Sequence, residues 1–404
     1  MTHASHATHP LPTSARHLVW LALALSGGAA LSLGITRFSY GLLLPPMRAD
    51  LGWSYTLAGA MNTVNALGYL LGALITPRLL QRFGAASVLI AGAVLASVFM
   101  GMSGFFTATG PLLVQRLLAG VASALVFIAG GLLAARLGAL QPTRGGFLIG
   151  LYYGGTGFGI VLSALLVPAV LEAASAQPHG WAWAWWMLAL ACCAVSALLV
   201  WPARVLSHLA PVTPATQAAV AVFAWRPMGF ALAGYAMFGV GYIGYMTFVI
   251  ALLREQGASG SAVTVFYALL GLAVLASSRI WARLLDRYKG GQVLALLCAL
   301  LGLATILPAL TKAWPVVLAS GLLFGGVFLS LVASTTALVR HNLPQAAWGA
   351  GISAFTIVFA AGQIVGPTIV GWIADGPGGL SRGLVFSALA LWIGALLASR
   401  QRAL

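Results

Sequence analysis

Acidic residues are scarce in this chain. Asp and Glu together account for 5 of 404 residues, and charged residues of both signs for only 6%. A soluble protein of this length needs a far more charged surface. The three cysteines (Cys192, Cys193 and Cys298) lie in apolar segments without CxxC spacing, which argues against a disulfide framework or a metal site. Since 61% of the residues are hydrophobic, the composition predicts a membrane protein.

Residues that enzymes use are missing from the apolar segments. All seven histidines fall in termini, loops or segment ends, and no Asp or Glu lies deep in an apolar run. Intramembrane metalloproteases need His and Glu ligands, and serine proteases need a base. Neither Lys289 nor Lys312 fits the P-loop pattern, so ATP binding of that kind is excluded. We therefore expect no enzyme, no cofactor and no metal.

Long unbroken apolar runs predict an all-α membrane protein. A barrel would instead alternate over segments of about ten residues, whereas about 20 apolar residues cross a bilayer as a helix. We expect twelve transmembrane helices, at residues 18–46, 55–76, 87–106, 110–135, 145–171, 181–202, 228–253, 261–281, 292–310, 314–339, 347–374 and 384–399.

The breaks between these runs predict the domain organisation. The longest one, 203–227, reads as a cytoplasmic linker between an N-terminal half (18–202) and a C-terminal half (228–404), with residues 1–17 as a cytoplasmic tail. The termini and the loops after even-numbered helices carry fourteen Lys or Arg residues and one acid, whereas the loops after odd-numbered helices carry four of each sign. Positive loops stay in the cytoplasm, so both termini are predicted to be cytoplasmic. The positive charge is spread thinly, and we expect no nucleic-acid partner.

The two halves show an internal repeat. Residues 77–83 (PRLLQRF) match 282–288 (ARLLDRY) at an offset of 205 residues. The same offset, without gaps, pairs Gly34 with Gly239, Tyr40 with Tyr245, Gly52 with Gly257 and Ser54 with Ser259. The offset is close to half the chain, which predicts two parallel six-helix repeats.

Several motifs resemble those of the major facilitator superfamily (MFS). The loop after the second helix is similar to the family's G-x-L-A-D-R-x-G-R signature in Leu79, Arg82, Phe83 and Gly84, although Gln81 replaces the acid. The acid is present in the second copy, as Asp286 beside Arg287. The fourth helix resembles a second signature in Arg116 and Gly120. Glycines of the fifth helix (146, 150, 154, 155, 157 and 159) and residues 362–367 resemble a third.

A narrower resemblance is to the YbfB/YjiJ-like branch of this superfamily. It rests on residues 34–47 (GITRFSYGLLLPPM) and 68–74 (GYLLGAL). The resemblance implies a carrier in the bacterial cytoplasmic membrane that moves a small solute by alternating access, with its site near the midplane between the repeats. It also implies a conformational latch at Arg82, Gly84, Asp286 and Arg287. We expect a monomer whose partners are the lipid bilayer and the solute.

Two arginines stand out because they lie well inside apolar segments. Placing an arginine there costs about 2.5 kcal/mol or more, so it usually faces the bundle interior. The resemblance places the helices of Arg37 and Arg116 along the central cavity. A guanidinium there, without a carboxylate, favours a small organic anion as the solute, with Arg37 as the main counter-charge. Alternatively, each arginine bonds backbone carbonyls of a neighbouring helix.

Polar and aromatic residues at helical spacing extend this candidate site. We expect substrate contacts from Tyr40, Asn62, Asn65, Tyr69, Phe238, Tyr242, Tyr245 and Gln363. Tyr242 occupies the repeat position of Arg37. Ordinary helix packing explains such stripes equally well, which leaves an exporter of neutral or amphipathic compounds as an alternative. A non-transporting sensor or scaffold is a further alternative, although it would need a sizeable soluble domain.

Overall fold

The computed structural model describes residues 14–141, 144–207, 225–344 and 347–404. Within these residues it has twelve helical spans long and apolar enough to cross a membrane, which confirms the predicted number. The chain is therefore an integral, multi-pass membrane protein. Most of the predicted N-terminal tail (1–13) and of the predicted linker (208–224) lies outside the described residues.

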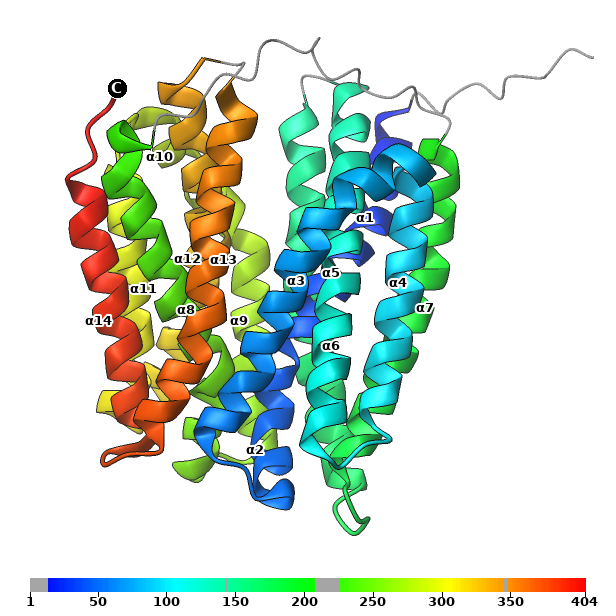
Figure 1. Cartoon of the computed structure of the whole chain (residues 1–404), viewed down its shortest axis with the longest axis vertical. Helices are drawn as coiled ribbons and strands as arrows, with labels where there is room; N and C mark the ends of the chain where they lie inside the picture. Colours follow the sequence, from blue (N-terminus) through cyan, green and yellow to red (C-terminus); the bar gives the residue numbers. More distant parts are fainter. Residues whose placement is uncertain (1–13, 142–143, 208–224, 345–346) are drawn as a thin grey trace, which may run out of the picture.

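Each half contributes six spans (Figure 1). The N-terminal half consists of α1 (Ala15–Ala29), η1 (Ala30–Phe38), α2 (Tyr40–Leu51), α3 (Tyr55–Phe83), α4 (Ala85–Ser103), α5 (Thr109–Ala139), α6 (Gly145–Ala173) and α7 (Trp181–Ser207). The C-terminal half consists of η3 (Arg226–Met228), α8 (Gly229–Glu255), α9 (Gly260–Ile280), α10 (Ala282–Arg287), α11 (Gln292–Leu310), α12 (Trp314–Asn342), α13 (Trp348–Ala374) and α14 (Gly379–Ser399).

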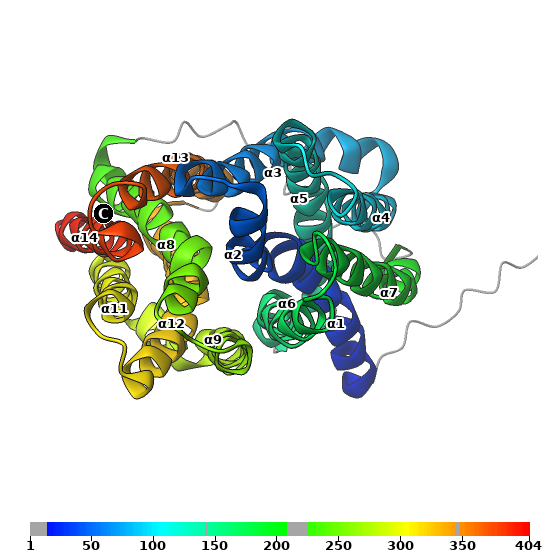
Figure 2. The same ribbon diagram turned by 90° about the horizontal axis from the view of Figure 1, so that it is seen from below.

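The halves form two groups of helices that lie side by side (Figure 2). Contacts between the groups are made mainly by three pairs, α3 with α13, α2 with α8, and α6 with α9. Apolar side chains on the outside of the bundle, such as Trp20 and Trp372, are exposed, as expected for surfaces that face lipid.

The sequence repeat is visible in the first loop of each half. Gly52 and Gly257 both have positive φ, at 66° and 92°, a backbone conformation that glycine adopts without steric cost. Ser54 and Ser259 then cap the next helix in the same way, each side-chain oxygen accepting a backbone N–H at 3.1 Å. The offset of 205 residues therefore reflects two copies of one structural unit.

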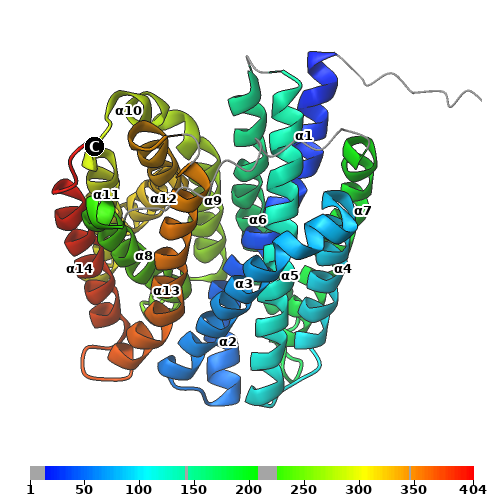
Figure 3. The same ribbon diagram turned by 45° about the horizontal axis from the view of Figure 1, so that its top comes forward.

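The first span is not the single α-helix that the sequence predicts. Its middle, η1, is a π-helix that joins α1 at the upper end of the bundle to α2 at the lower end (Figure 3). The Thr36 hydroxyl donates to the carbonyl of Leu31, five residues earlier, at 2.7 Å. Such segments are rare and often occur at functional sites, because they displace side chains from the regular helical positions. Arg37 lies at the end of this segment.

Close backbone contact holds η1 against α6. A Cβ atom added to Gly34 would lie 2.5 Å from the Cα of Gly159 and 2.6 Å from the carbonyl oxygen of Thr156. Both are backbone atoms and have no rotamer by which to move away. The position therefore requires glycine.

Hydrogen bonds join the halves at the lower end of Figure 1, where α2 ends and α3 begins. Asp375, directly after α13, accepts the backbone N–H groups of Tyr55 (2.6 Å) and Thr56 (2.8 Å) and the Thr56 hydroxyl (2.6 Å). The Tyr55 hydroxyl donates to Glu255 at the end of α8, and the Arg48 guanidinium lies 3.7 Å from the Tyr55 ring centroid. A carboxylate at the N-terminus of α3 also complements the helix dipole.

Three further contacts continue this interface upward. Thr63 bonds Ile364 and Thr368, Asn62 bonds Thr247, and Tyr267 bonds the carbonyl of Phe38. Above them, no hydrogen bond joins the halves within residues 14–141, 144–207, 225–344 and 347–404. There the Arg279 guanidinium of α9 lies 5.6 Å from the ring centroid of Phe147 in α6. The halves are therefore tied together mainly at their lower ends.

Replacement of Gly34 by alanine is expected to destabilise the protein, because its Cβ would overlap the backbone of α6. Overpacking of this kind costs about 1–3 kcal/mol, so the melting temperature in detergent should fall by several degrees. Gly150→Ala in α6 is the matched control, since nothing lies within 4 Å of its Cβ position. Equal melting temperatures for the two variants would contradict the close contact.

Replacement of Asp375 by alanine is expected to weaken the closure of the lower end. Losing partly exposed, charge-assisted hydrogen bonds costs about 1–2 kcal/mol, which is roughly a tenfold shift in a two-state equilibrium. Electron paramagnetic resonance distances between spin labels at the lower ends of α4 and α11 should show the added, separated population. Glu172→Ala is the control, because the Glu172 side chain makes no hydrogen bond or ion pair with the described residues. Unchanged distances in Asp375→Ala would refute this role.

The same contact predicts a pH dependence. Burial raises the pKa of Asp375, but hydrogen bonds from Thr56 and Tyr55 and the charge of Arg48 outweigh it and bring the pKa below the ordinary 3.8. Because the pKa of Asp375 is lowered in the bonded state, its ionised carboxylate stabilises that state at pH values above the ordinary pKa of 3.8. This stabilisation is lost as the pH falls through the lowered pKa. The label distances should therefore be constant near neutral pH and increase only in acid.

Candidate functional site

Arg37 is a buried cation whose side chain makes no hydrogen bond or ion pair with the described residues. Its residue is only 3% exposed, and its Nε and Nη2 atoms are buried without a hydrogen-bond partner among the described residues. All five acidic residues lie at or beyond the ends of the long spans, at Asp50, Glu172, Glu255, Asp286 and Asp375. No carboxylate within the spans neutralises this charge.

The two unsatisfied atoms of Arg37 lie on the same edge of the guanidinium group. Nε–H and one N–H of Nη2 point in parallel, which is the geometry that grips both oxygens of a carboxylate. A carboxylate can accept from both donors, one with each oxygen. This unsatisfied edge therefore has the donor geometry and charge to bind a planar oxyanion side-on.

Aromatic residues of both halves lie close to the segment that carries Arg37. Its guanidinium carbon lies 5.9 Å from the centroid of the Tyr69 ring in α3. Phe38, the residue directly after Arg37, packs edge-on against Phe328 of α12, with ring centroids 5.8 Å apart. Tyr69 and Phe328 belong to different halves, so this segment lies at the interface between the repeats.

Arg116 in α5 is equally buried, at 2% exposure, but has partners. Its Nη1 donates to the carbonyl of Thr36 in η1 at 2.9 Å, and its Nη2 donates to the Asn62 side chain at 3.1 Å. The rings of Tyr40 and Trp185 lie 5.1 Å and 5.7 Å from its guanidinium carbon. Arg116 therefore anchors the π-helix that carries Arg37.

Three of the expected contact residues belong to this anchor. Asn65 donates to the carbonyl of Arg116 at 2.9 Å, and Tyr40 donates to the carbonyl of Ala58 at 2.8 Å. Asn62 donates to the Thr247 hydroxyl of α8 at 2.8 Å, which links the anchor to the opposite half. These polar atoms are occupied by the protein itself.

The C-terminal half presents a group of nearly parallel rings, which we name the C-half stack. Its stacked pairs have centroids 4.1–6.1 Å apart and interplanar angles of 13–29°. The members are Tyr235, Phe238, Tyr242, Tyr245, Phe324, Phe328 and Phe359. Phe359 is half-buried, whereas the other six are fully buried.

Hydroxyl groups fix the position of two rings in this stack. Tyr242 donates to the side-chain oxygen of Gln363 in α13 at 2.8 Å. Tyr245 is hydrogen-bonded to the Ser320 hydroxyl of α12 at 2.7 Å and stacks on Phe324, so it lies within the C-terminal half. Of the expected contact residues, Tyr69 lies within cation–π distance of Arg37, while Phe238 and Gln363 contact Tyr242.

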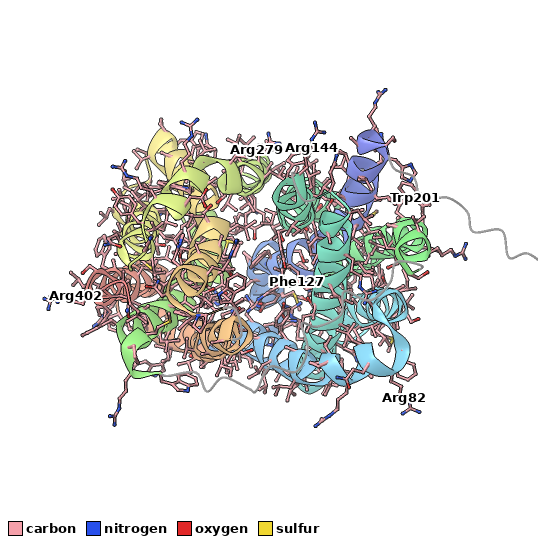
Figure 4. All side chains as sticks on the ribbon, turned by 90° about the horizontal axis from the view of Figure 1, so that it is seen from above. Arg82, Phe127, Arg144, Trp201, Arg279 and Arg402 are labelled. Carbon is pink, nitrogen blue, oxygen red and sulfur yellow. The ribbon has the colours of Figure 1, made fainter. Side chains whose placement is uncertain are left out.

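Phe127 of α5 is a site residue that the sequence interpretation missed. Its ring lies 6.4 Å from that of Tyr69 and 5.4 Å from that of Tyr153, and Figure 4 shows it near the middle of the molecule. Arg116, Gly120, Ser123 and Phe127 follow a helical 4,3,4 spacing, so they share one face of α5. That spacing was the available signal. Nothing in the sequence marked Thr36 or Thr247, whose roles depend on tertiary contacts.

The expected latch residues are not brought together in this structure. Arg82 is exposed, lies 5.2 Å from the ring of its neighbour Phe83, and extends from the rim in Figure 4. Gly84 ends α3 with a φ of 77°, while Asp286 and Arg287 are exposed in α10. No ion pair links these residues in the part of the chain that the structure describes. The latch stays a prediction.

Comparisons with known proteins agree with this architecture. The family model described as "Uncharacterised MFS-type transporter YbfB" matches residues 29–399. The fold is similar to that of a bacterial homolog of the human lysosomal transporter Spinster, in an inward-facing and unoccupied conformation. The two sequences are 17% identical, the match covers 96% of this chain and 98% of that chain, and the TM-score is 0.73. The nucleoside transporter NupG is also similar, with 14% identity, coverage of 95% and 98%, and a TM-score of 0.71. These low identities establish the fold alone, and no curated protein sequence matches the chain.

The two single variants Arg37→Gln and Arg116→Gln should change the free energy of unfolding in opposite directions. Arg37→Gln removes a charge whose burial is uncompensated, so the free energy of unfolding should rise, by up to about 2 kcal/mol. Arg116→Gln removes the donors to Thr36 and Asn62 and should lower it by about 2–4 kcal/mol. Thermal unfolding of both variants in the same detergent measures the difference. A larger loss in Arg37→Gln than in Arg116→Gln would contradict the assignment.

Proposed function

Because the chain belongs to the YbfB-like family of major facilitator superfamily transporters, as its motifs predicted, we propose that it carries a small organic anion across the membrane. Arg37 is the main counter-charge for this solute. The observation that supports the proposal is that the Nε and Nη2 atoms of its guanidinium are buried without a hydrogen-bond acceptor among the described residues. A carboxylate there would replace the lost hydration of both donors.

Movement follows from the position of this site between the halves. A solute that contacts Arg37 on one side and Tyr242 on the other binds both repeats at once. In carriers built from repeats, rocking of one half against the other exposes such a site to each side in turn. The hydrogen bonds of Asp375 and Glu255 hold the lower ends together in this state. Opening requires that these bonds break.

Arg116 supports the site indirectly. Its hydrogen bond to the carbonyl of Thr36 holds the residue directly before Arg37. The bonded guanidinium also adds positive charge near the site without offering Nη donors to the solute. We therefore assign Arg116 to the positioning of Arg37.

The absence of acidic residues from the interior of the described spans limits which coupling mechanisms can operate. A proton relay through Asp or Glu has no candidate in the interior, since all five acids lie at or beyond the ends of the long spans. We propose that transport proceeds by anion exchange, by facilitated movement, or with a proton carried by the solute itself.

The orientation in the membrane is also a proposal. The excess of arginine in the termini and in the loops after even-numbered spans favours cytoplasmic termini in a bacterial inner membrane. The upper end of Figure 1 is then cytoplasmic, and the end closed by Asp375 faces outward. The expected latch residues Arg82, Asp286 and Arg287 lie near the cytoplasmic end under this orientation.

The aromatic rings on both sides favour one alternative, an exporter of neutral or amphipathic compounds. In that case Arg37 would serve only the structure, although no described residue accepts a hydrogen bond from its Nε or Nη2. The two functions differ in the sign of the solute that stabilises the protein.

A thermal-shift screen with organic acids, sugars and cationic drugs tests the proposal. Organic acids should raise the melting temperature of the wild type, because binding to the folded state alone stabilises it. Arg37→Gln should show no such rise when its melting temperature with an organic acid is compared with its melting temperature without ligand. Arg37→Lys keeps the charge without the two-donor edge and should bind about tenfold more weakly.

Uptake of the most stabilising acid into proteoliposomes completes the test. We expect uptake by the wild type, and little by Arg37→Gln. Anion uptake that is unchanged in Arg37→Gln would defeat the proposal, and stabilisation by cationic or neutral compounds alone would favour the exporter.

A further inference from the structure

We infer that the solute is a flat aromatic carboxylate, with its carboxylate on Arg37 and its ring against the aromatic residues on either side. This inference rests on the proposed function, because it uses the same guanidinium. It adds that the organic part of the anion is recognised by ring stacking rather than by size or apolarity alone.

The first supporting observation is the C-half stack. Phe359 lies nearly parallel to Phe238, at 13° with centroids 5.1 Å apart, and nearly parallel to Tyr242, at 18° and 5.4 Å. Six of the seven rings are fully buried, so they support one another and leave Phe359 as the half-buried member. A rigid, flat surface of this kind suits another flat ring better than a puckered or branched group.

The second observation is that this surface is joined to the segment that carries the cation. Tyr242 stacks on both Phe328 and Phe359. Phe38, the residue directly after Arg37, packs edge-on against Phe328 of the stack, with centroids 5.8 Å apart. The stack therefore lies beside η1, on the side of the C-terminal half.

The third observation is a second group of rings on the opposite side. Tyr69, 5.9 Å from the guanidinium carbon of Arg37, neighbours Phe127, which in turn neighbours Tyr153. Tyr69 and Phe127 are half-buried and Tyr153 is exposed, so this group is accessible in part. Figure 4 shows Phe127 near the middle of the molecule. A ligand at Arg37 would thus meet rings from both repeats.

These features together discriminate between classes of ligand. An aliphatic acid satisfies the arginine but gains no ring stacking, and a neutral aromatic compound leaves the guanidinium donors without an acceptor. Stacked aromatic pairs gain enough beyond apolar burial to change a dissociation constant about threefold to tenfold. The preference for an aromatic acid over an aliphatic acid of the same size should be of this order.

Three probes of similar size separate the two parts of the inference. Benzoate carries a ring and a carboxylate, cyclohexanecarboxylate carries the carboxylate without aromaticity, and benzamide carries the ring without charge. Titration calorimetry on the full-length protein in detergent gives their dissociation constants. We expect benzoate to bind about threefold to tenfold more tightly than cyclohexanecarboxylate, and benzamide to show no saturable binding.

Two variants test the residues. Phe359→Leu should remove most of the preference for benzoate while leaving the affinity for cyclohexanecarboxylate nearly unchanged. Phe355→Leu is the matched control, because Phe355 lies one turn away on α13 and is buried, with its ring edge-on to Tyr235. Its ratio of the two dissociation constants should equal that of the wild type. Arg37→Gln should abolish binding of both acids.

The possible outcomes distinguish this inference from the proposed function. If both acids bind equally and both require Arg37, the aromatic preference is refuted and the anion carrier stands. If benzoate does not bind at millimolar concentration, the aromatic inference is also refuted. If both acids bind undiminished to Arg37→Gln, or if benzamide binds as tightly as benzoate, the role of Arg37 itself is refuted.

Discussion

The low dielectric of the bundle interior makes an unpaired guanidinium costly, and the placement of one such group governs this structure. An arginine at membrane depth costs about 2.5 kcal/mol or more, and this cost falls when its donors find acceptors. Arg116 meets that requirement for Nη1 with the carbonyl of Thr36 and for Nη2 with the side chain of Asn62, and only its Nε lacks an acceptor among the described residues. Arg37 has no such acceptor for Nε and Nη2 among the described residues. The fold therefore buries a charge whose compensation by a bound anion is the core of the proposed function.

The π-helix explains how the two arginines differ although both are buried. An α-helix uses its carbonyls internally, whereas the wider turn of η1 leaves the Thr36 carbonyl available to Arg116. Arg116 thereby fixes the backbone directly before Arg37. The close approach of Gly34 to Gly159 fixes the other side of the same segment. These two contacts together fix the backbone that carries the Arg37 side chain.

Much of the fold could be predicted from the sequence, because bilayer thickness fixes the length of apolar runs and the repeat copies whole turns. The twelve spans, and the pairing of Gly52 with Gly257, follow from such local rules. The difference between Arg37 and Arg116 could not be predicted, since both lie in apolar runs and their partners come from residues distant in sequence. The π-helix was missed for the same reason. η1 packs against α5 and α6, and no local pattern in residues 30–38 reveals these contacts.

The candidate site is asymmetric although it lies between two repeats of one structural unit. Arg37 and Tyr242 occupy equivalent positions in the two halves, yet one carries a cation and the other belongs to the C-half stack. A symmetric pair of arginines would repel each other across the interface, and a symmetric pair of tyrosines would hold no charge. The N-terminal half carries the cation beside Tyr69, and the C-terminal half carries the larger stack of rings. Under the proposed function, a solute bound between them would contact both halves, so their relative movement would depend on the bound solute.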